Sequence, residues 1–192
     1  MAAPALNWPR SLTAVMLVML LPVGIVYTQE IPPPAYQLAA QRVGIPSAVL
    51  YAVALQESGI RRNGRLIPWP WTLNVAGQSL RYVSRADACA RLKQALRQES
   101  PTRVDVGLGQ INVGYHQQHY RQPCDLLDPY ANLGLAADLL RKHHAAGEDW
   151  LLAMGRYHRP AGGAPAERYR RSVSQHLDRV LGTSRSRKEP TL

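Results

Sequence analysis

Apolar residues recur at intervals of three and four along most of the chain after residue 30, the spacing of helices that bury one face. The pattern predicts helices over residues 36–43, 47–58, 84–98, 133–144, 149–157 and 165–181. Glycines stand at or shortly beyond the ends of four of these segments: Gly44, Gly59, Gly147 and Gly182. Ser47 and Ser84 stand where a side chain can cap a helix start.

One segment departs from the helical spacing. Apolar and polar positions alternate over residues 71–75, a turn-forming stretch follows at 76–79, and alternation resumes over 80–83. Alternation on both sides of a turn predicts a β-hairpin. The expected fold class is therefore mainly α (α+β), a small helical domain with one β-hairpin inserted.

The N-terminus follows neither pattern. Residues 11–29 are 19 uncharged residues preceded by Arg10. Such a run predicts a secretory signal peptide, and a retained N-terminal membrane anchor is the alternative, because no strong cleavage site follows. In both cases the rest is expected to be exported to the periplasm, as one domain over residues 30–182 and a flexible basic tail over 183–192.

Export would allow the two cysteines to form a disulfide. Cys89 and Cys124 are the only cysteines of the sequence. A disulfide is permitted outside the cytoplasm, and closing a loop of this length would stabilise the fold by about 3–4 kcal/mol. We expect the two residues to be bonded; two free, buried thiols are the alternative.

The sequence is strongly basic, with 23 Lys and Arg against 13 Asp and Glu, a net charge of +10. This charge suits an anionic partner, whether nucleic acid, membrane surface or cell-wall polymer. The predicted leader disfavours nucleic acid. Histidine pairs occur at His116 and His119 and at His143 and His144, but no His-Glu-x-x-His motif is present, so we expect surface histidines and neither a metal nor another cofactor.

Glu57 is the candidate catalytic residue that the helical pattern indicates. On a helix it shares a face with Leu50, Val53 and Ala54, which normally turns inward. Burial raises the pKa of a carboxyl group and favours the protonated form, which a general acid needs. The alternative is a partly exposed glutamate near a helix end.

A glycine-containing stretch, residues 106–112, offers a second candidate element. Gly107 and Gly109 would let the backbone approach a ligand closely. Gln110 and Asn112 would present amides that both donate and accept hydrogen bonds, as sugar hydroxyl and acetamido groups require.

Four motifs occur in a recognisable order. Residues 54–59 resemble the Glu-Ser motif of lytic transglycosylases with a soluble-lytic-transglycosylase, goose-lysozyme-like domain. Residues 107–111 resemble the Gly-Leu-Met-Gln-Ile motif of that family, with Gly109 in place of Met. Residues 128–133 and 153–157 resemble its Asp-Pro-x-x-Asn-Ile and Ala-x-x-x-Tyr segments. The resemblance covers about residues 47–160, and it departs where Tyr157-His158-Arg159-Pro160 replaces the Tyr-Asn-Ala-Gly of the family.

This resemblance implies a lysozyme-like fold and the cleavage of peptidoglycan glycan strands with formation of 1,6-anhydro-N-acetylmuramic acid ends. It implies that Glu57 acts as the one catalytic acid and base, although Asp105 is the nearest candidate for a second carboxylate. Residues expected to bind substrate or orient Glu57 are Ser58, Gln110, Asn112, Asn132 and Tyr157. A non-catalytic wall-binding scaffold and a hydrolytic muramidase are the alternative functions.

A Trp-rich stretch, residues 68–77, resembles the hairpin insertion of family members associated with conjugation and type IV secretion. Components of such a machine are therefore expected partners, with inner-membrane association through the N-terminus. The two tryptophans either edge the sugar cleft or pack on the core. Basic residues following the Glu57 helix or flanking Tyr157 are expected around the cleft: Arg61, Arg62, Arg65, Arg156 and Arg159.

Overall fold

The computed structural model describes residues 29–183. Its helices are α1 (Pro34–Val43), α2 (Ser47–Ser58), α3 (Arg85–Ala95), α4 (Pro129–His143), α5 (Trp150–His158) and α6 (Gly163–Leu181). Its strands are β1 (Gly59–Arg62), β2 (Arg65–Pro68), β3 (Thr72–Val75), β4 (Gln78–Arg81), β5 (Val104–Val106) and β6 (Ile111–Asn112). Short 3-10 helices are η1 (Pro101–Arg103), η2 (Gln117–His119) and η3 (Pro123–Leu127).

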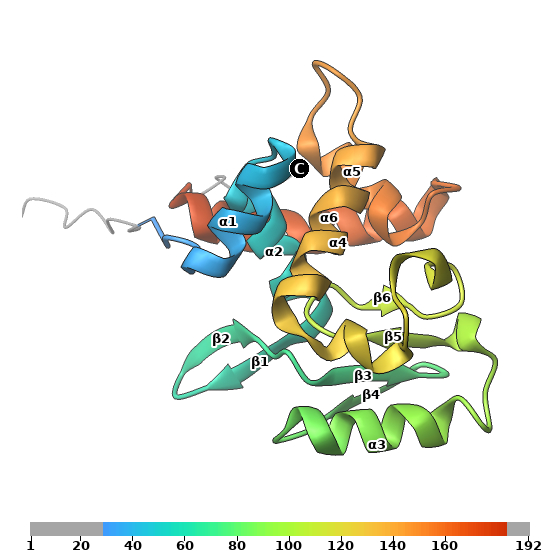
Figure 1. Ribbon diagram of the computed structural model, residues 1–192. Coiled ribbons are helices and arrows are strands. Elements are labelled where there is room, and N and C mark those ends of the chain that lie inside the picture. Colours follow the sequence, from blue (N-terminus) through green and yellow to red (C-terminus); the bar gives the residue numbers. More distant parts are fainter. Residues whose placement is uncertain (1–28, 184–192) are drawn as a thin grey trace, which may run out of the picture.

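Helix α2 is the centre of the helical part. Every residue from Val49 to Leu55 is buried, because α1, α4 and α6 all pack against this helix. In Figure 1, α1, α2, α5 and α6 lie together in the upper half of the molecule, and α4 runs from beside the sheet up to them. A helix enclosed in this way ends inside the protein, so its last turn can bring a side chain to an internal surface.

The strands form the other part of the molecule. β1 and β2 make a hairpin of their own, and the second sheet has the antiparallel order β4-β3-β5-β6. Figure 1 shows α3 along the side of this sheet away from the other helices. In the register of the sheet, Leu73 pairs with Val106 and Asp105 pairs with Asn112. Leu73 and Val106 are fully buried, so one face of the sheet contributes to the core.

A disulfide joins α3 to η3. Cys89 and Cys124 are bonded, 35 positions apart in the sequence. The bond fixes the sheet-side helix to the segment that leads into α4.

The predicted fold class, mainly α with a small antiparallel sheet, is confirmed. Helices begin or end close to the expected residues, with Gly44 and Gly182 as left-handed C-caps, and Ser84 accepts a capping hydrogen bond from the Asp87 amide. The capping role expected of Ser47 is wrong, because Pro46 is the N-cap residue and no side chain caps α2.

Two other differences have a local cause. α4 begins at Pro129, four residues before the first expected position, because the Asp128 side chain caps it and its first turn lies outside the apolar stripe. It also ends at His143, so Gly147 does not stop it. The predicted hairpin is present as β3–β4, whereas β1–β2 and β5–β6 were not expected.

The two ends of the described chain meet. The Glu30 amide donates to the Val180 carbonyl, and the Glu30 carboxylate pairs with Arg179 at 3.0 Å. The predicted leader and tail, except for residues 29 and 183, lie outside the described residues. Between residues 29 and 183, no single helix is long and apolar enough to cross a membrane. The pair α1 and α2, bent by 120°, meets this criterion by length and composition only.

Candidate functional site

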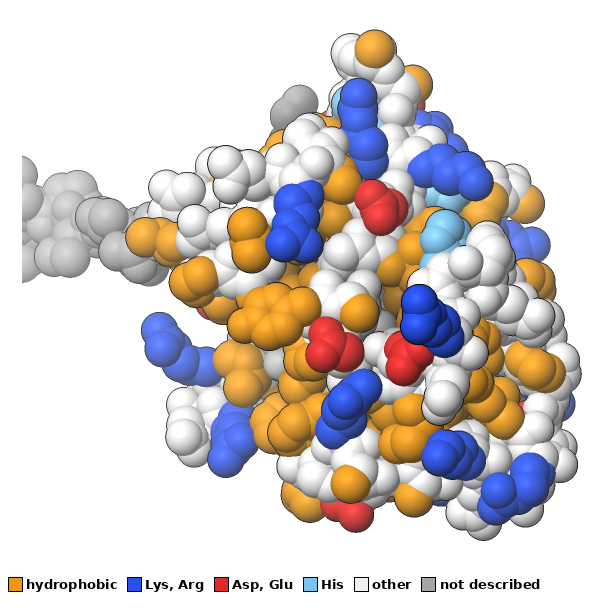
Figure 2. Space-filling model, in the orientation of Figure 1, with side chains coloured by type: hydrophobic (Ala, Val, Ile, Leu, Met, Phe, Trp, Pro, Cys, Tyr) orange, Lys and Arg blue, Asp and Glu red, His pale blue; other side chains and the backbone are white. Residues whose placement is uncertain are grey.

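Glu57 lies in the last turn of α2 and faces a cleft of about 920 Å³ between the helical part and the sheet. The cleft is lined by residues of α2, β3–β6, the loop between β5 and β6, the loop after β6, α4, α5 and the segment after α5. They are Gln56, Glu57, Asn74, Ser79, Arg81, Asp105, Gln110, Ile111, Asn112, Tyr115, His116, Leu139, His143, Tyr157, His158, Arg159, Pro160 and Ala161. Figure 2 shows acidic side chains at the centre of the pictured face, with basic side chains near them.

The surroundings of Glu57 raise the pKa of its carboxyl group toward neutral pH. Burial, the main cause, raises its pKa to about 7, and the nearby Asp105 carboxylate raises it too. Tyr169, from α6, donates a hydrogen bond to Glu57 Oε1 at 2.6 Å, which stabilises the ionised form and lowers the pKa. A carboxyl group of this kind can both give and take a proton.

Asp105 is the second carboxylate of the cleft. It lies on β5 opposite Asn112 on β6, and Asn112 Nδ2 donates to Asp105 Oδ1 at 2.8 Å. Burial raises the pKa of Asp105, and the Asn112 hydrogen bond lowers it. Asn112 Oδ1 also accepts hydrogen bonds from the amides of Gly114 and Tyr115. The Asn112 side chain therefore holds the loop after β6 as well as lining the cleft.

The loop between β5 and β6, residues 107–110, borders the cleft and is held by side chains of α2, α4 and α5. Ser58 Oγ is buried, 2.8 Å from the Leu108 carbonyl and 3.0 Å from the Ala54 carbonyl. Asn132 is fully buried; its Oδ1 accepts from the Gly109 amide at 2.8 Å and its Nδ2 donates to two backbone carbonyls. Neither Ser58 nor Asn132 lines the cleft, so the structure gives them a positioning role through this loop.

Tyr157 holds the same loop from α5. Its hydroxyl donates to the Gly109 carbonyl at 2.6 Å. Burial, followed by the charges of Glu57 and Asp105, raises its pKa well above the usual range, so it stays a neutral donor. The sequence placed Tyr157 near Glu57. The structure adds that Tyr169, which lies within the helix expected over residues 165–181, makes the hydrogen bond to the acid.

Gln110 is the side chain of the loop that faces the cleft. Its Nε2 donates to the carbonyls of Gly107 and Thr72 at 2.9 and 3.2 Å. Both amide hydrogens are therefore used by the protein. Within residues 29–183 its Oε1 accepts no hydrogen bond and remains for a ligand hydroxyl or amide.

The packing around Gly109 accounts for glycine in place of the Met of the Gly-Leu-Met-Gln-Ile motif. A Cβ atom at this position would lie 2.8 Å from both Ala136 Cβ and the Tyr157 hydroxyl. These distances are shorter than real contacts allow, so the close packing of α4 and α5 on the loop requires glycine here.

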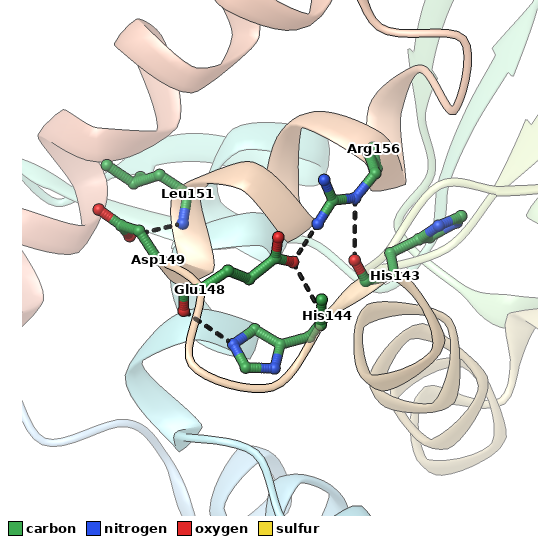
Figure 3. Close-up of polar contacts among 7 residues, drawn as sticks. His143, His144, Glu148, Asp149, Leu151 and Arg156 are labelled. Carbon is green, nitrogen blue, oxygen red and sulfur yellow. Dashed lines mark hydrogen bonds and ion pairs between the residues drawn. The ribbon is translucent and has the colours of Figure 1, made fainter.

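The charge placement expected from the sequence is wrong for four of the five arginines. Arg61, Arg62, Arg65 and Arg156 do not line the cleft. Arg156 instead pairs with Glu148 and donates to the His143 carbonyl, and thereby ties the loop after α4 to α5 (Figure 3). Arg156 makes these contacts because α5 packs beside the end of α4. The position of Arg156 next to Tyr157 in the sequence could not show this.

Arg159 lines the cleft as expected, and Arg81 on β4 joins it. His158, where the family has Asn, stacks on the Tyr169 ring with 4.5 Å between ring centroids. His116 and His143 line the cleft as well, although they were expected as ordinary surface residues. No three His, Cys, Asp or Glu side chains between residues 29 and 183 come together in a way that could hold a metal ion.

The two tryptophans of residues 68–77 lie between β2 and β3 and pack on the protein. Trp69 Nε1 donates to the Tyr82 carbonyl at 2.7 Å and Trp69 meets Trp71 edge to face. Trp71 packs against the core, and neither tryptophan lines the cleft. Of the two roles left open by the sequence, the structure supports packing.

Comparison with known families agrees with this geometry. The chain matches the family model of the transglycosylase SLT domain over residues 34–180, a range that contains every residue of the cleft. No curated protein and no solved structure matches the chain. Since the match covers most of its length, the chain belongs to the transglycosylase SLT domain family, with a lytic-transglycosylase type of activity on peptidoglycan.

Proposed function

We propose that this protein cleaves the β-1,4 bond between N-acetylmuramic acid and N-acetylglucosamine and leaves a 1,6-anhydro ring on the muramic acid. The observation that carries the proposal is Glu57, a carboxyl group at the cleft with its pKa raised to about 7. Both of its protonation states are populated near neutral pH, so one side chain can serve first as acid and then as base.

The reaction needs no water. Protonated Glu57 donates its proton to the glycosidic oxygen, the bond from C1 to that oxygen breaks, and the N-acetylglucosamine unit leaves with a new hydroxyl group. The acetamido group of the substrate stabilises the positive charge left at C1. Glu57, now a carboxylate, takes the proton from the C6 hydroxyl of the muramic acid, and O6 bonds to C1.

The surrounding residues suit this exchange. The Tyr169 hydroxyl stabilises the carboxylate form of Glu57 between the two proton transfers. Gln110 Oε1 is placed to accept from a sugar hydroxyl or acetamido group. Ser58, Asn132 and Tyr157 keep the Gln110 loop in position.

Replacing Glu57 tests the assignment. Glu57→Gln keeps the shape of the side chain and removes the titrating proton, so we expect the release of muropeptides from purified sacculi to fall at least about 100-fold. Glu167→Gln, at an exposed position of α6, is the matched control and should keep wild-type release. Full release by Glu57→Gln would contradict the catalytic role, and a wild-type protein that binds sacculi without releasing products would indicate a scaffold.

Asp105 favours a second candidate, a hydrolytic muramidase. Glycosidases that use water commonly employ two carboxylates, and Asp105 shares the cleft with Glu57. Mass spectrometry of the products separates the two reactions. Anhydromuropeptides support the transglycosylase, whereas reducing-end muropeptides support the muramidase.

We further propose that the domain works in the periplasm, where it opens the wall locally for a secretion or conjugation machine. The uncharged run at residues 11–29 and the Cys89–Cys124 disulfide favour export. The association with a machine rests on the resemblance of residues 68–77 alone. Cell fractionation should recover the protein in the periplasm or at the inner membrane, and recovery in the cytosol would contradict the proposal.

A further inference from the structure

Two arginines lie at the cleft without an acidic partner among residues 29–183. Arg81 ends β4 and Arg159 follows α5, so they come from the sheet side and the helical side of the cleft. Within the described range 29–183, other arginines form the ion pairs with acids. Arg81 donates from Nη2 to the Gly59 carbonyl at 3.2 Å, which orients its guanidinium without neutralising it.

Among residues 29–183, Glu57 and Asp105 form no ion pair with Arg81 or Arg159. A cation close to a carboxyl group would lower its pKa. Glu57 and Asp105 both have raised pKa values, and the causes that lower them are hydrogen bonds from Tyr169 and Asn112. Arg159 instead acts on His158, whose pKa is lowered by burial and then by the charge of Arg159. Both guanidinium groups are therefore available to a ligand.

A bound peptidoglycan strand offers suitable anions. In a strand that carries peptide stems, the sugars are uncharged and the lactyl group is linked to the stem as an amide. The negative charges are the free carboxylates of the stems. Guanidinium groups bind carboxylates through paired, charge-assisted hydrogen bonds.

We propose that Arg81 and Arg159 bind stem carboxylates, so that the enzyme selects glycan strands that carry acidic peptide stems. The inference rests on the proposed function in taking peptidoglycan as the ligand of this cleft. It assigns substrate selection to two residues outside the Glu57 chemistry.

Neutralising the carboxylates of the substrate tests the selection. Sacculi with acetylated amines are compared before and after carbodiimide amidation, which removes the charge and keeps the stems. We expect the wild-type protein to release products from the charged sacculi at least about fivefold faster, and Arg81→Gln/Arg159→Gln to lose this preference. Arg159→Lys should retain part of it. Arg97→Gln, at an exposed residue beyond α3, is the matched control and should keep the whole preference.

A loss of rate that is equal on both substrates would mean a structural role and overturn the inference, as would a double variant with the wild-type preference. Binding gives a readout that needs no turnover. Glu57→Gln should co-sediment more strongly with charged than with amidated sacculi, and the two Arg→Gln changes should abolish the difference. If Glu57→Gln binds charged and amidated sacculi equally, the proposed role of Arg81 and Arg159 is wrong whatever the reaction is. If binding depends on charge but the wild-type protein shows no turnover, only the proposed reaction is wrong.

Discussion

Glu57 shows how much of the candidate site depends on contacts between distant residues. Its position on a helix with apolar neighbours indicated burial, and the structure gives a buried α2 with Glu57 at its inner end. The sequence spacing alone could not reveal Tyr169, 112 positions away, as the donor to its carboxylate. Tyr169 fits the apolar stripe of α6, and only the packing of α6 on α2 gives its hydroxyl a partner.

Burial raises the pKa of Glu57 and the hydrogen bond from Tyr169 lowers it, so both affect the pH range of the proposed reaction. Activity that needs protonated Glu57 should fall as the pH rises through about 7. The hydrogen bond lowers the pKa, so Tyr169→Phe should raise it and move this fall in kcat/KM to higher pH. The measurement is the pH profile of kcat/KM on soluble glycan strands.

Tyr130→Phe is the control for this change, because Tyr130 is 68% exposed and lies outside the cleft. It should leave the profile in place. An unchanged profile in Tyr169→Phe, or a shift to lower pH, would contradict the assigned contact.

At the scale of elements, the loop from Gly107 to Gln110 was expected to approach a ligand, and the structure shows what holds it. Side chains from α2, α4 and α5 all bond to its backbone: Ser58, Asn132 and Tyr157. The motif order indicated that these residues belong to one site. Their roles as supports for a loop follow only from tertiary contacts, because each binds a backbone group more than 20 positions away.

The missed strands have a different explanation. β5 and β6 have three and two residues, and β1–β2 carries three arginines among its eight positions. Segments this short or this polar do not give a clear period-two signal. Pairing with β3, which the sequence did indicate, makes β5 a strand.

The packing around the loop predicts a penalty for the family residue at position 109. Gly109→Met would force a Cβ atom against Ala136 and Tyr157, so we expect a loss of about 1–3 kcal/mol in the free energy of unfolding and a lower rate of muropeptide release. Gly134→Ala is the control: no atom lies within 4 Å of the added Cβ inside α4, and the change should stabilise by about 0.5–1 kcal/mol. Urea denaturation compares the two, and a Gly109→Met protein of wild-type stability would refute the packing argument.

At the scale of the whole molecule, one covalent link joins the sheet side to the entry of α4. The Cys89–Cys124 bond closes a separation of 35 residues, which corresponds to about 3–4 kcal/mol of stability lost on reduction. Thermal unfolding with and without reductant measures the loss, and the intact mass should rise by two hydrogens. An unchanged mass in reductant under unfolding conditions would show that the two thiols are free.

The half-buried Glu57 also links the stability of the whole molecule to pH. Between the ordinary pKa of 4.5 and the folded value of about 7, the folded chain keeps a proton that the unfolded chain has released. The free energy of unfolding should therefore fall by about 2–3 kcal/mol as the pH rises through this window. Glu57→Gln removes this term, so its Tm relative to wild type should increase from pH 5 to pH 8. Glu167→Gln should show no such trend.

The sequence by itself determined the mainly α fold class, most helix positions, one hairpin, the family resemblance and the choice of Glu57. These follow from local periodicity, turn residues and short motifs, which a linear chain displays directly. The tertiary structure decided which side chains meet at the cleft. It brought Tyr169 to Glu57 and placed Arg81 and Arg159 at the same cleft, and it paired Arg156 with Glu148 elsewhere. The physical reason is that burial, pKa and charge pairing depend on neighbours in space, which packing brings together from distant parts of the chain.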